Sequence, residues 1–306
     1  GLVVIFSSLV SSVYAEEVRL NWGHYLSNGS FIEVENNFIG AVERRSHQRA
    51  KFNTVYSGGL GAGSELLTLT SRGAIDFGAI VPGYYGDRLL YAKTLQIPFL
   101  FDSPVEAIEV AEYAYEKIPE FRNELDSLGI IRLFHQPLGA YYLAGPSDDC
   151  KKLEGLKGKK VRTFGSDIAQ MMAAVGAIPL SIAPGDQYEA LERGTLDYAF
   201  ANLGTIEAYR LYEPGRFICG PVLSMAGHMI VVGSDTWQNL ANSLQEIIAE
   251  EAKVAQREYV EWVKTNEAKA GMRIEASGAI IVSLTAEDLT RWEESTPDLL
   301  QLWVEE

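Results

Sequence analysis

The stretch Ser71-Arg-Gly-Ala-Ile-Asp-Phe-Gly-Ala79 decides the fold of this chain, because a close copy returns as Glu192-Arg-Gly-Thr-Leu-Asp-Tyr-Ala199. Each copy follows a short amphipathic stretch and precedes an apolar run. A glycine that adopts a left-handed conformation ends a helix, and a strand begins shortly after it. The repeat therefore predicts two similar α/β units, and two such lobes with a cleft between them are typical of a ligand-binding clamp.

The segments around the first copy alternate between strand and helix. Residues 18–23 alternate apolar and polar side chains as a strand does, and apolar residues then recur at helical spacing over 31–42. A second strand at 52–56 leads through the glycine-rich loop 57–63 to a helix at 64–72 and a strand at 75–81. This βαβαβ order predicts a parallel sheet with helices on its faces.

The second half repeats the order and then contains one long helix. We expect strands at 160–164, 178–182 and 196–201, with helices at 167–175 and 185–193. From 237 to about 266 apolar residues keep the helical period, and at ~1.5 Å per residue such a helix is roughly 40 Å or more in length. A helix of this length reaches across both lobes. A last strand is predicted at 273–282 and a C-terminal helix at 285–302.

Composition limits the class of protein. The chain has 306 residues, of which 47% are hydrophobic, so it is long enough for two domains and is neither disordered nor fibrous. Its net charge of -15 leaves no basic stripe to neutralise phosphates. We therefore expect no nucleic-acid partner.

The N-terminal segment indicates export. Residues 2–13 are apolar, and Val13-Tyr14-Ala15 is followed at once by Glu16 and Glu17. This is the pattern of a signal-peptide apolar region and cleavage site, and the stretch is too short to span a bilayer. We expect residues 1–15 to be a signal-peptide remnant, cleaved after Ala15, and the mature protein to be periplasmic.

The cysteines and histidines narrow the chemistry. Cys150 and Cys219 are the two cysteines, and in an oxidising compartment they predict one disulfide, with two buried free thiols as the alternative. The four histidines form no zinc-binding spacing, so we expect no metal site. The loop at 57–63 lacks the ending of a phosphate-binding loop and the dinucleotide spacing, so no cofactor is expected.

In the order and spacing of its short motifs, the chain resembles a known family. These motifs are the glycine loop with Glu65 behind it, the long helix after 235–237, and the stretches 72–76, 97–101, 156–162, 175–179 and 188–197. Over 18–302 the chain is similar to the periplasmic solute-binding subunit of a tripartite ATP-independent periplasmic (TRAP) transporter, in the C4-dicarboxylate-binding-protein-like group.

The resemblance implies a fold and a function. The expected fold is α/β: a two-lobed periplasmic binding protein, type II-like, with mainly parallel sheets flanked by helices and a long hinge-spanning helix. Lobe I is expected to comprise 16–138 plus 226–262, and lobe II 139–225 plus 263–306. The expected function is capture of a small organic acid between the lobes and its delivery to TRAP integral membrane subunits, without enzymatic turnover.

The resemblance also implies two ligand-binding residues. Arg162 occupies the place of the arginine that grips the ligand carboxylate in this family, and a guanidinium pairs both carboxylate oxygens. Asn202 occupies the place of an asparagine that completes the site, with a simple turn residue as the alternative. The chain departs from many relatives by having no arginine at 139–142, and by having Pro184 and Ala201 where they carry an aromatic and an acidic residue.

These departures point to an aromatic pocket and one carboxylate. The aromatic residues expected to face the cleft, with core packing as their alternative, are Tyr84, Tyr85, Tyr141, Tyr142 and Phe164. His24, at the end of the first strand, and Glu65 complete the candidate site. One arginine balances one carboxylate, so we predict a monocarboxylate with a hydroxyl, keto or ring group, in preference to succinate or malate. A protonated His24 would supply the charge for a second carboxylate.

Two alternatives remain open from sequence. An exported two-lobed enzyme for small molecules would require a nucleophile or an acid/base pair in the cleft. A binding protein serving a different permease or a sensor has the same sequence signals.

Overall fold

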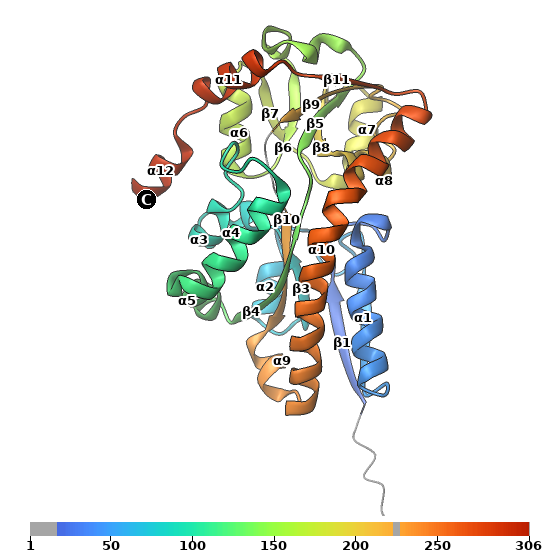
Figure 1. The fold of residues 1–306 in the computed structure, drawn as a ribbon, viewed down its shortest axis with the longest axis vertical. Coiled ribbons are helices and arrows are strands. Elements are labelled where there is room, and N and C mark those ends of the chain that lie inside the picture. Colours follow the sequence, from blue (N-terminus) through green and yellow to red (C-terminus); the bar gives the residue numbers. More distant parts are fainter. Residues whose placement is uncertain (1–16, 223–226, 306) are drawn as a thin grey trace, which may run out of the picture.

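Two lobes, each built on its own β-sheet, make up the molecule (Figure 1). The computed structural model describes residues 17–222 and 227–305, so the predicted signal-peptide segment 1–15 lies outside the described residues. The first sheet has the order β2-β1-β3-β10-β4, and its strands are β1 (Val18–Gly23), β2 (Ala50–Val55), β3 (Phe77–Ile80), β4 (Ile130–Pro137) and β10 (Gly227–Gly233). The second has the order β11-β9-β5-β8, with β5 (Tyr141–Gly145), β8 (Ala199–Asn202), β9 (Phe217–Val222) and β11 (Ile280–Ser283). A separate pair joins β6 (Lys160–Thr163) to β7 (Ile178–Ser181).

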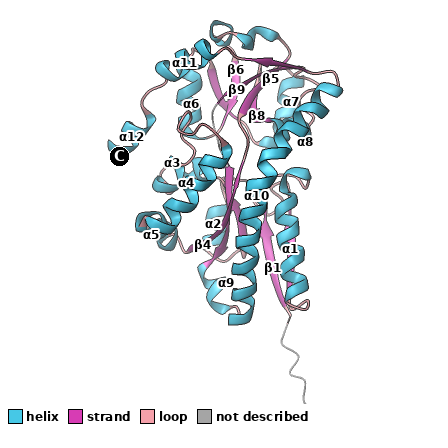
Figure 2. Cartoon of the chain, in the orientation of Figure 1, coloured by secondary structure: helices cyan, strands magenta, loops and turns pink. Residues whose placement is uncertain are grey.

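Helices surround the strands of both lobes (Figure 2). In the first half of the chain they are α1 (Glu33–Arg45), α2 (Leu66–Ser71), α3 (Leu90–Thr94), α4 (Pro104–Lys117) and α5 (Pro119–Ser127). In the second half they are α6 (Gly165–Ala174), α7 (Gln187–Glu192), α8 (Leu203–Ala208), α9 (Ser234–Asn239), α10 (Asn242–Ala276), α11 (Ala286–Ser295) and α12 (Leu299–Glu305). None of the helices within 17–222 and 227–305 combines the length and the apolar character that a membrane crossing requires.

The repeated motif forms the same structure twice, as predicted. Gly73 has φ of 69° and Gly194 has φ of 68°, so both take the left-handed conformation that an L side chain disfavours. The aspartate of each copy then anchors a neighbouring strand. Asp76 Oδ2 accepts the backbone N–H of Asn21 at 2.7 Å, and Asp197 Oδ2 accepts that of Lys160 at 2.7 Å.

The two-lobed α/β fold is confirmed, and its sheets are mixed in strand direction. The pairs β1–β2, β1–β3, β6–β7 and β9–β11 are parallel, whereas β10 runs antiparallel to β3 and β4, and β5 runs antiparallel to β8 and β9. The antiparallel pairs arise where the chain crosses between sheets from β4 to β5 and from β9 to β10, and it crosses a third time along α10, from β10 to β11. The first crossing joins residue 137 to residue 141, and the second follows the end of β9 at residue 222, while the predicted lobe boundaries themselves stay a prediction.

Helix α10 runs along both lobes, shown in orange in Figure 1. It contacts α1 and β4 in the first lobe and α8 in the second. It has 35 residues and differs from the predicted helix at both ends. The predicted first turn is the separate helix α9, because Leu240 and Ala241 are extended, with ψ of 141° and 140°. The predicted strand at 273–282 shortens to β11, because Ala270 and Ile274 are buried one helical turn apart at the end of α10.

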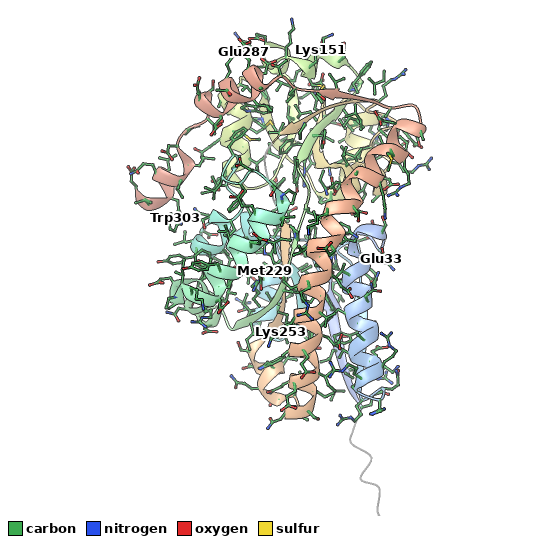
Figure 3. The ribbon with its side chains drawn as sticks, viewed as in Figure 1. Glu33, Lys151, Met229, Lys253, Glu287 and Trp303 are labelled. Carbon is green, nitrogen blue, oxygen red and sulfur yellow. A yellow bond between two sulfur atoms is a disulfide. The ribbon has the colours of Figure 1, made fainter. Side chains whose placement is uncertain are left out.

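The C-terminal segment forms two helices where one was predicted. Pro297 follows Thr296, and a proline keeps the residue before it out of the helical conformation, here with ψ of 135°. Helix α12 then returns to the first lobe, where Trp303 Nε1 donates to Leu90 O at 2.8 Å (Figure 3). This contact ties the C-terminal helix to the first lobe.

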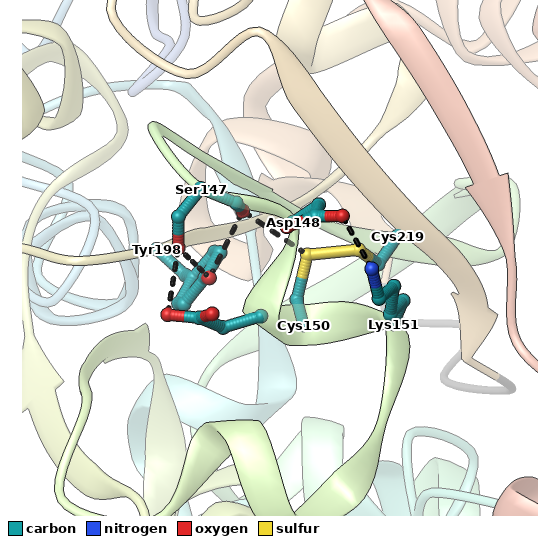
Figure 4. Close-up of a disulfide and its surroundings, with 7 residues drawn as sticks. Ser147, Asp148, Cys150, Lys151, Tyr198 and Cys219 are labelled. Carbon is teal, nitrogen blue, oxygen red and sulfur yellow. Dashed lines mark hydrogen bonds and ion pairs between the residues drawn. A yellow bond between two sulfur atoms is a disulfide. The ribbon is translucent and has the colours of Figure 1, made fainter.

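The predicted disulfide is confirmed. Cys150 and Cys219 are bonded, with Cα atoms 5.8 Å apart across 69 residues of sequence (Figure 4). The bond holds the loop after β5 against β9, and Ser147 Oγ lies 2.8 Å from the hydroxyl of Tyr198 beside it.

Candidate functional site

Two adjoining pockets lie between the lobes. The inner pocket has a cavity volume of about 30 Å³ and the outer one about 420 Å³, and Tyr25, Tyr84, Phe164 and Pro184 line both. The other residues of the inner pocket are Leu26, Val81, Leu138, Tyr141, Arg162, Gln187, Ala201, Thr205 and Gly227. Since each lobe contributes part of this lining, a ligand here would touch both lobes.

Arg162 lies on β6 in the wall of the inner pocket and is only 4% exposed. Its Nε donates to Ile182 O at 3.0 Å and its Nη1 to Phe200 O at 3.1 Å. Its guanidinium carbon lies 4.7 Å from the centre of the Phe164 ring. These contacts fix the guanidinium, yet within 17–222 and 227–305 no carboxylate forms an ion pair with it. A buried charge without a counter-charge is costly, so the site favours an anion.

Aromatic rings build the walls around Arg162. The ring of Phe164 lies 5.6 Å from that of Tyr141 and 6.3 Å from that of Tyr84, between centroids. Burial raises the pKa of Tyr141 above its ordinary value. Burial also raises the pKa of Tyr84, although the nearby Arg162 opposes this by its charge and a hydrogen bond. Both phenols therefore keep their protons at neutral pH and offer hydroxyl groups to the pocket.

Tyr142 and Tyr85 do not line either pocket. Tyr142 follows Tyr141 on β5, and successive side chains of a strand point to opposite faces, so Tyr142 packs in the lobe II core near Gly220. Tyr85 lies in the lobe I core, where its hydroxyl donates to Gly63 O and accepts the N–H of Leu67. Both tyrosines therefore pack in the core, which is the alternative stated for them in the sequence analysis.

Asn202 and Glu65 lie next to the pockets and support them. Asn202 is fully buried; its Oδ1 accepts the N–H of Thr205 at 3.2 Å, which caps α8, and its Nδ2 donates to Glu267 Oε1 at 2.9 Å. Asn202 thus positions Thr205, which lines the inner pocket, but Asn202 itself does not line that pocket. Glu65 Oε2 accepts the N–H of Ala62 at 2.7 Å and shapes the loop that lines the outer pocket.

His24 lies behind the pocket in a buried polar cluster. Its Nε2 lies 2.8 Å from Glu35 Oε2, and Nε2 of His228 lies 2.7 Å from Glu35 Oε1. The hydroxyl of Tyr259 donates to the same Oε1 at 2.7 Å, and the hydroxyl of Tyr25 lies 3.1 Å from His228 Nδ1. Burial alone would raise the pKa of Glu35, but the two histidines hold it well below its usual range. His24 thus lies beside Glu35 inside the protein and lines neither pocket.

The cluster has the residue types of a metal site, but the ring proton of His24 lies on the nitrogen that a metal ion would need. Ligand atoms of His24, Glu35 and His228 lie within 4.8 Å of one another. However, the N–H of Leu26 donates to His24 Nδ1 at 3.0 Å, so the ring proton lies on Nε2, which faces Glu35. A metal-bound histidine needs an unprotonated nitrogen toward the metal. The geometry is that of a hydrogen-bonded cluster.

Several pocket residues were not predicted from sequence. Tyr25 follows His24 at the carboxyl end of β1, and the rule that selected His24 would have found it. Gln187 and Thr205 gave no signal, because each begins or belongs to a short amphipathic helix whose orientation depends on the folded lobe.

A comparison with known proteins decides the family. The family model described as bacterial extracellular solute-binding protein, family 7, matches residues 23–306. The chain belongs to this family. The family assignment confirms the resemblance drawn from the short motifs and makes the chain an extracellular solute-binding protein.

Individual relatives agree with this family. The chain is 25% identical over 237 residues to a solute-binding protein of Chromohalobacter salexigens, covering 76% of this chain and 68% of the relative. It is similar in fold to Bordetella pertussis DctP6, an extracytoplasmic solute receptor binding pyroglutamic acid, with a TM-score of 0.87, 17% identity and coverage of 94% and 95%. It is also similar to a TRAP periplasmic solute-binding protein of C. salexigens with bound D-glucuronate, with a TM-score of 0.85, 20% identity and 94% of each chain covered.

Proposed function

We propose that this family 7 protein captures a small organic acid with one carboxylate between its lobes and delivers it to TRAP membrane subunits. The observation that carries the proposal is the buried Arg162, held by two backbone carbonyls and the Phe164 ring in a pocket lined by both lobes. A carboxylate is the natural counter-ion, since a guanidinium forms paired, charge-assisted hydrogen bonds with it.

The rest of the lining supports a ring-containing or hydroxylated monocarboxylate. The aromatic faces of Tyr84, Tyr141 and Phe164 suit a flat or cyclic ligand, and Arg162 is the one guanidinium among the described residues of the inner pocket. A second carboxylate would lie there without a cationic partner. The acids named for the two similar solved structures, pyroglutamic acid and D-glucuronate, each carry one carboxylate and one ring.

The pocket chemistry favours binding over turnover. The polar groups of the inner pocket are a guanidinium, phenols, one amide and one hydroxyl, which hold a ligand but make a weak acid/base pair. The histidines and Glu35 that would serve as an acid/base pair are buried behind Tyr25. Incubation with D-glucuronate followed by mass spectrometry tests this, because a chemically altered acid would favour the enzyme alternative.

We also propose that the protein acts in the periplasm and that residues 1–15 are removed as a signal peptide after Ala15. Mass spectrometry of protein exported from cells tests this: a mature chain beginning at Glu16 is expected, and an uncleaved chain contradicts it.

A ligand panel in a thermal-shift assay tests the binding function. The panel holds D-glucuronate, pyroglutamate, L-malate and succinate, each at the same concentration. A ligand at about 100 times its Kd stabilises the folded state by about 2.7 kcal/mol, which corresponds to a rise in Tm of roughly 4 °C for a chain of this length. We expect such a rise with D-glucuronate or pyroglutamate, whereas a response to the two dicarboxylates alone contradicts the proposal.

A further inference from the structure

The buried cluster behind the pocket has no role in the function proposed so far. It gathers side chains from four elements: His24 and Tyr25 after β1, Glu35 on α1, His228 on β10 and Tyr259 on α10. Tyr25 is its member that lines both pockets. Tyr25 is therefore the residue through which the cluster reaches the pockets.

The hydrogen bonds fix the positions of the protons one after another. The N–H of Leu26 donates to His24 Nδ1, which leaves the His24 proton on Nε2, toward Glu35. Glu35 acts as an acceptor, since Tyr259 donates to its Oε1 and a carboxylate has no proton to give. Nε2 of His228, 2.7 Å from the same Oε1, must then carry a proton.

The remaining nitrogen of His228 decides the role of Tyr25. With its proton on Nε2, a neutral His228 has a lone pair on Nδ1, 3.1 Å from the hydroxyl of Tyr25. Burial lowers the pKa of His228, which keeps the ring neutral at neutral pH. The Tyr25 hydroxyl therefore donates its proton away from the pocket. Its oxygen is left to accept hydrogen bonds from inside the pocket.

Gln187 supplies a second acceptor in the same pocket. Its side chain is fully buried, and its Nε2 donates to Pro184 O at 3.3 Å, which identifies the other atom as the amide oxygen. This Oε1 has no hydrogen-bond partner among the described residues. A buried acceptor without a partner is unfavourable, so a ligand that donates to it gains affinity.

We propose that the inner pocket selects acids that carry hydroxyl or N–H groups, which donate to Tyr25 and Gln187 while the carboxylate lies on Arg162. This inference rests on the proposed function. A site built to hydrogen-bond a ligand O–H or N–H rejects an analogue that lacks it, because the acceptors of the site then stay unpaired. Tyr25 thus touches the ligand directly, while His228 is a positioning residue that orients the Tyr25 proton.

The arrangement also predicts a response to acid. Protonation of His228 would place a proton on Nδ1, reverse its bond to Tyr25 and turn the phenol into a donor toward the pocket. The titratable groups that face His228 are Glu35 from α1, His24 and Tyr25 after β1, His135 from β4, and Tyr259 from α10 near Glu35. The groups that face Tyr25 across the pocket are Tyr84, Tyr141 and Tyr209.

Two measurements on the full chain test the inference. The first is the tautomer of His228 at pH 7, read from side-chain ¹⁵N NMR of histidine-labelled protein and assigned with His228→Gln. The second is calorimetry with D-glucuronate, which has hydroxyl donors, and cyclohexanecarboxylate, which has a similar ring and carboxylate but no donor. Wild type is compared with Tyr25→Phe and with the matched control Tyr115→Phe. Tyr115 is a buried lobe I tyrosine whose hydroxyl contacts Met229 Sδ away from the pocket.

We expect the His228 proton on Nε2 and tighter binding of D-glucuronate than of cyclohexanecarboxylate by wild type. Tyr25→Phe should weaken the binding of D-glucuronate at least ~10-fold and change any binding of cyclohexanecarboxylate by less than ~3-fold. It should also reduce the change in D-glucuronate affinity between neutral and acid pH. Tyr115→Phe should change none of these quantities. A proton on Nδ1, a Tyr25→Phe variant that keeps full affinity, or one that weakens both acids equally overturns the inference. Wild type that binds both acids equally well overturns it while the proposed function stands. If wild type binds neither acid, pyroglutamate, which has an N–H donor, replaces D-glucuronate in the same comparison. Wild type that does not bind pyroglutamate either removes the proposed function, and the inference with it.

Discussion

Replacement of Arg162 is expected to abolish capture of the acid. Arg162→Ala removes a buried charge-assisted partner of the ligand carboxylate, which is worth more than ~3 kcal/mol, or a loss of affinity of about 100-fold. Arg162→Lys should recover only part of this loss. A lysine ammonium cannot present a planar fork, and it cannot reproduce the paired bonds to Ile182 O and Phe200 O that hold the guanidinium over Phe164.

Isothermal titration calorimetry with D-glucuronate measures these losses, and circular dichroism checks that the variants fold. Arg132 on β4 offers a matched control, because its guanidinium also lies over an aromatic ring, 4.4 Å from the centre of Tyr115, but it pairs with Glu112 outside the pocket. Arg132→Lys should leave the affinity unchanged. An Arg162→Ala variant that folds and binds within a few-fold of wild type would refute the role given to Arg162.

Reduction of the Cys150–Cys219 disulfide should lower the free energy of unfolding by about 4 kcal/mol, since the bond closes a loop of 69 residues; urea unfolding with and without reductant measures this, and an unchanged midpoint contradicts it. Gly165→Ala should weaken ligand binding at least ~10-fold, because its Cβ would lie 2.5 Å from Gly83 O in the other lobe and oppose closure. The control is Gly158→Ala, because Gly158 has a similar positive φ but no atom lies within 4 Å of the added Cβ. Equal ligand affinities of the two variants in calorimetry would count against a role for the contact between Gly165 and Gly83. Burial raises the pKa of Glu267 from 4.5 to about 7, so this carboxyl stabilises the folded state fully below pH 4.5 and loses that contribution as pH rises through about 7. The loss amounts to about 3 kcal/mol, and Glu267→Ala should remove about this much of the fall in unfolding free energy between pH 5 and 8. The same pH dependence in wild type and variant would contradict the assignment to Glu267.

The fold was largely predictable because its signals are local. The glycine and aspartate of the repeated motif form the same turn and the same strand anchor twice, and both features depend on residues close in sequence or in neighbouring strands. The element ends were harder to predict. The break between α9 and α10 at Leu240 follows an uninterrupted apolar period, so no residue type marks it. The break at Pro297 was visible in the sequence and was missed.

The site was predictable only in part, because it depends on contacts between distant segments. Placement of Arg162, Phe164, Tyr84 and Tyr141 in the inner pocket agrees with the sequence expectation, although their contact with ligand stays a prediction. The strand register turns Tyr142 away from the pocket. The cluster behind Tyr25 joins residues 193 positions apart, as in the His228–Glu35 pair, and no spacing in the sequence reveals that they meet.

A crystal structure with D-glucuronate bound tests the central claim most directly. We predict the carboxylate in the inner pocket, with both oxygens at hydrogen-bond distance from the Arg162 guanidinium, and both lobes in contact with the sugar ring. A carboxylate bound away from Arg162, or a ligand that touches one lobe alone, would contradict the proposed mode of capture.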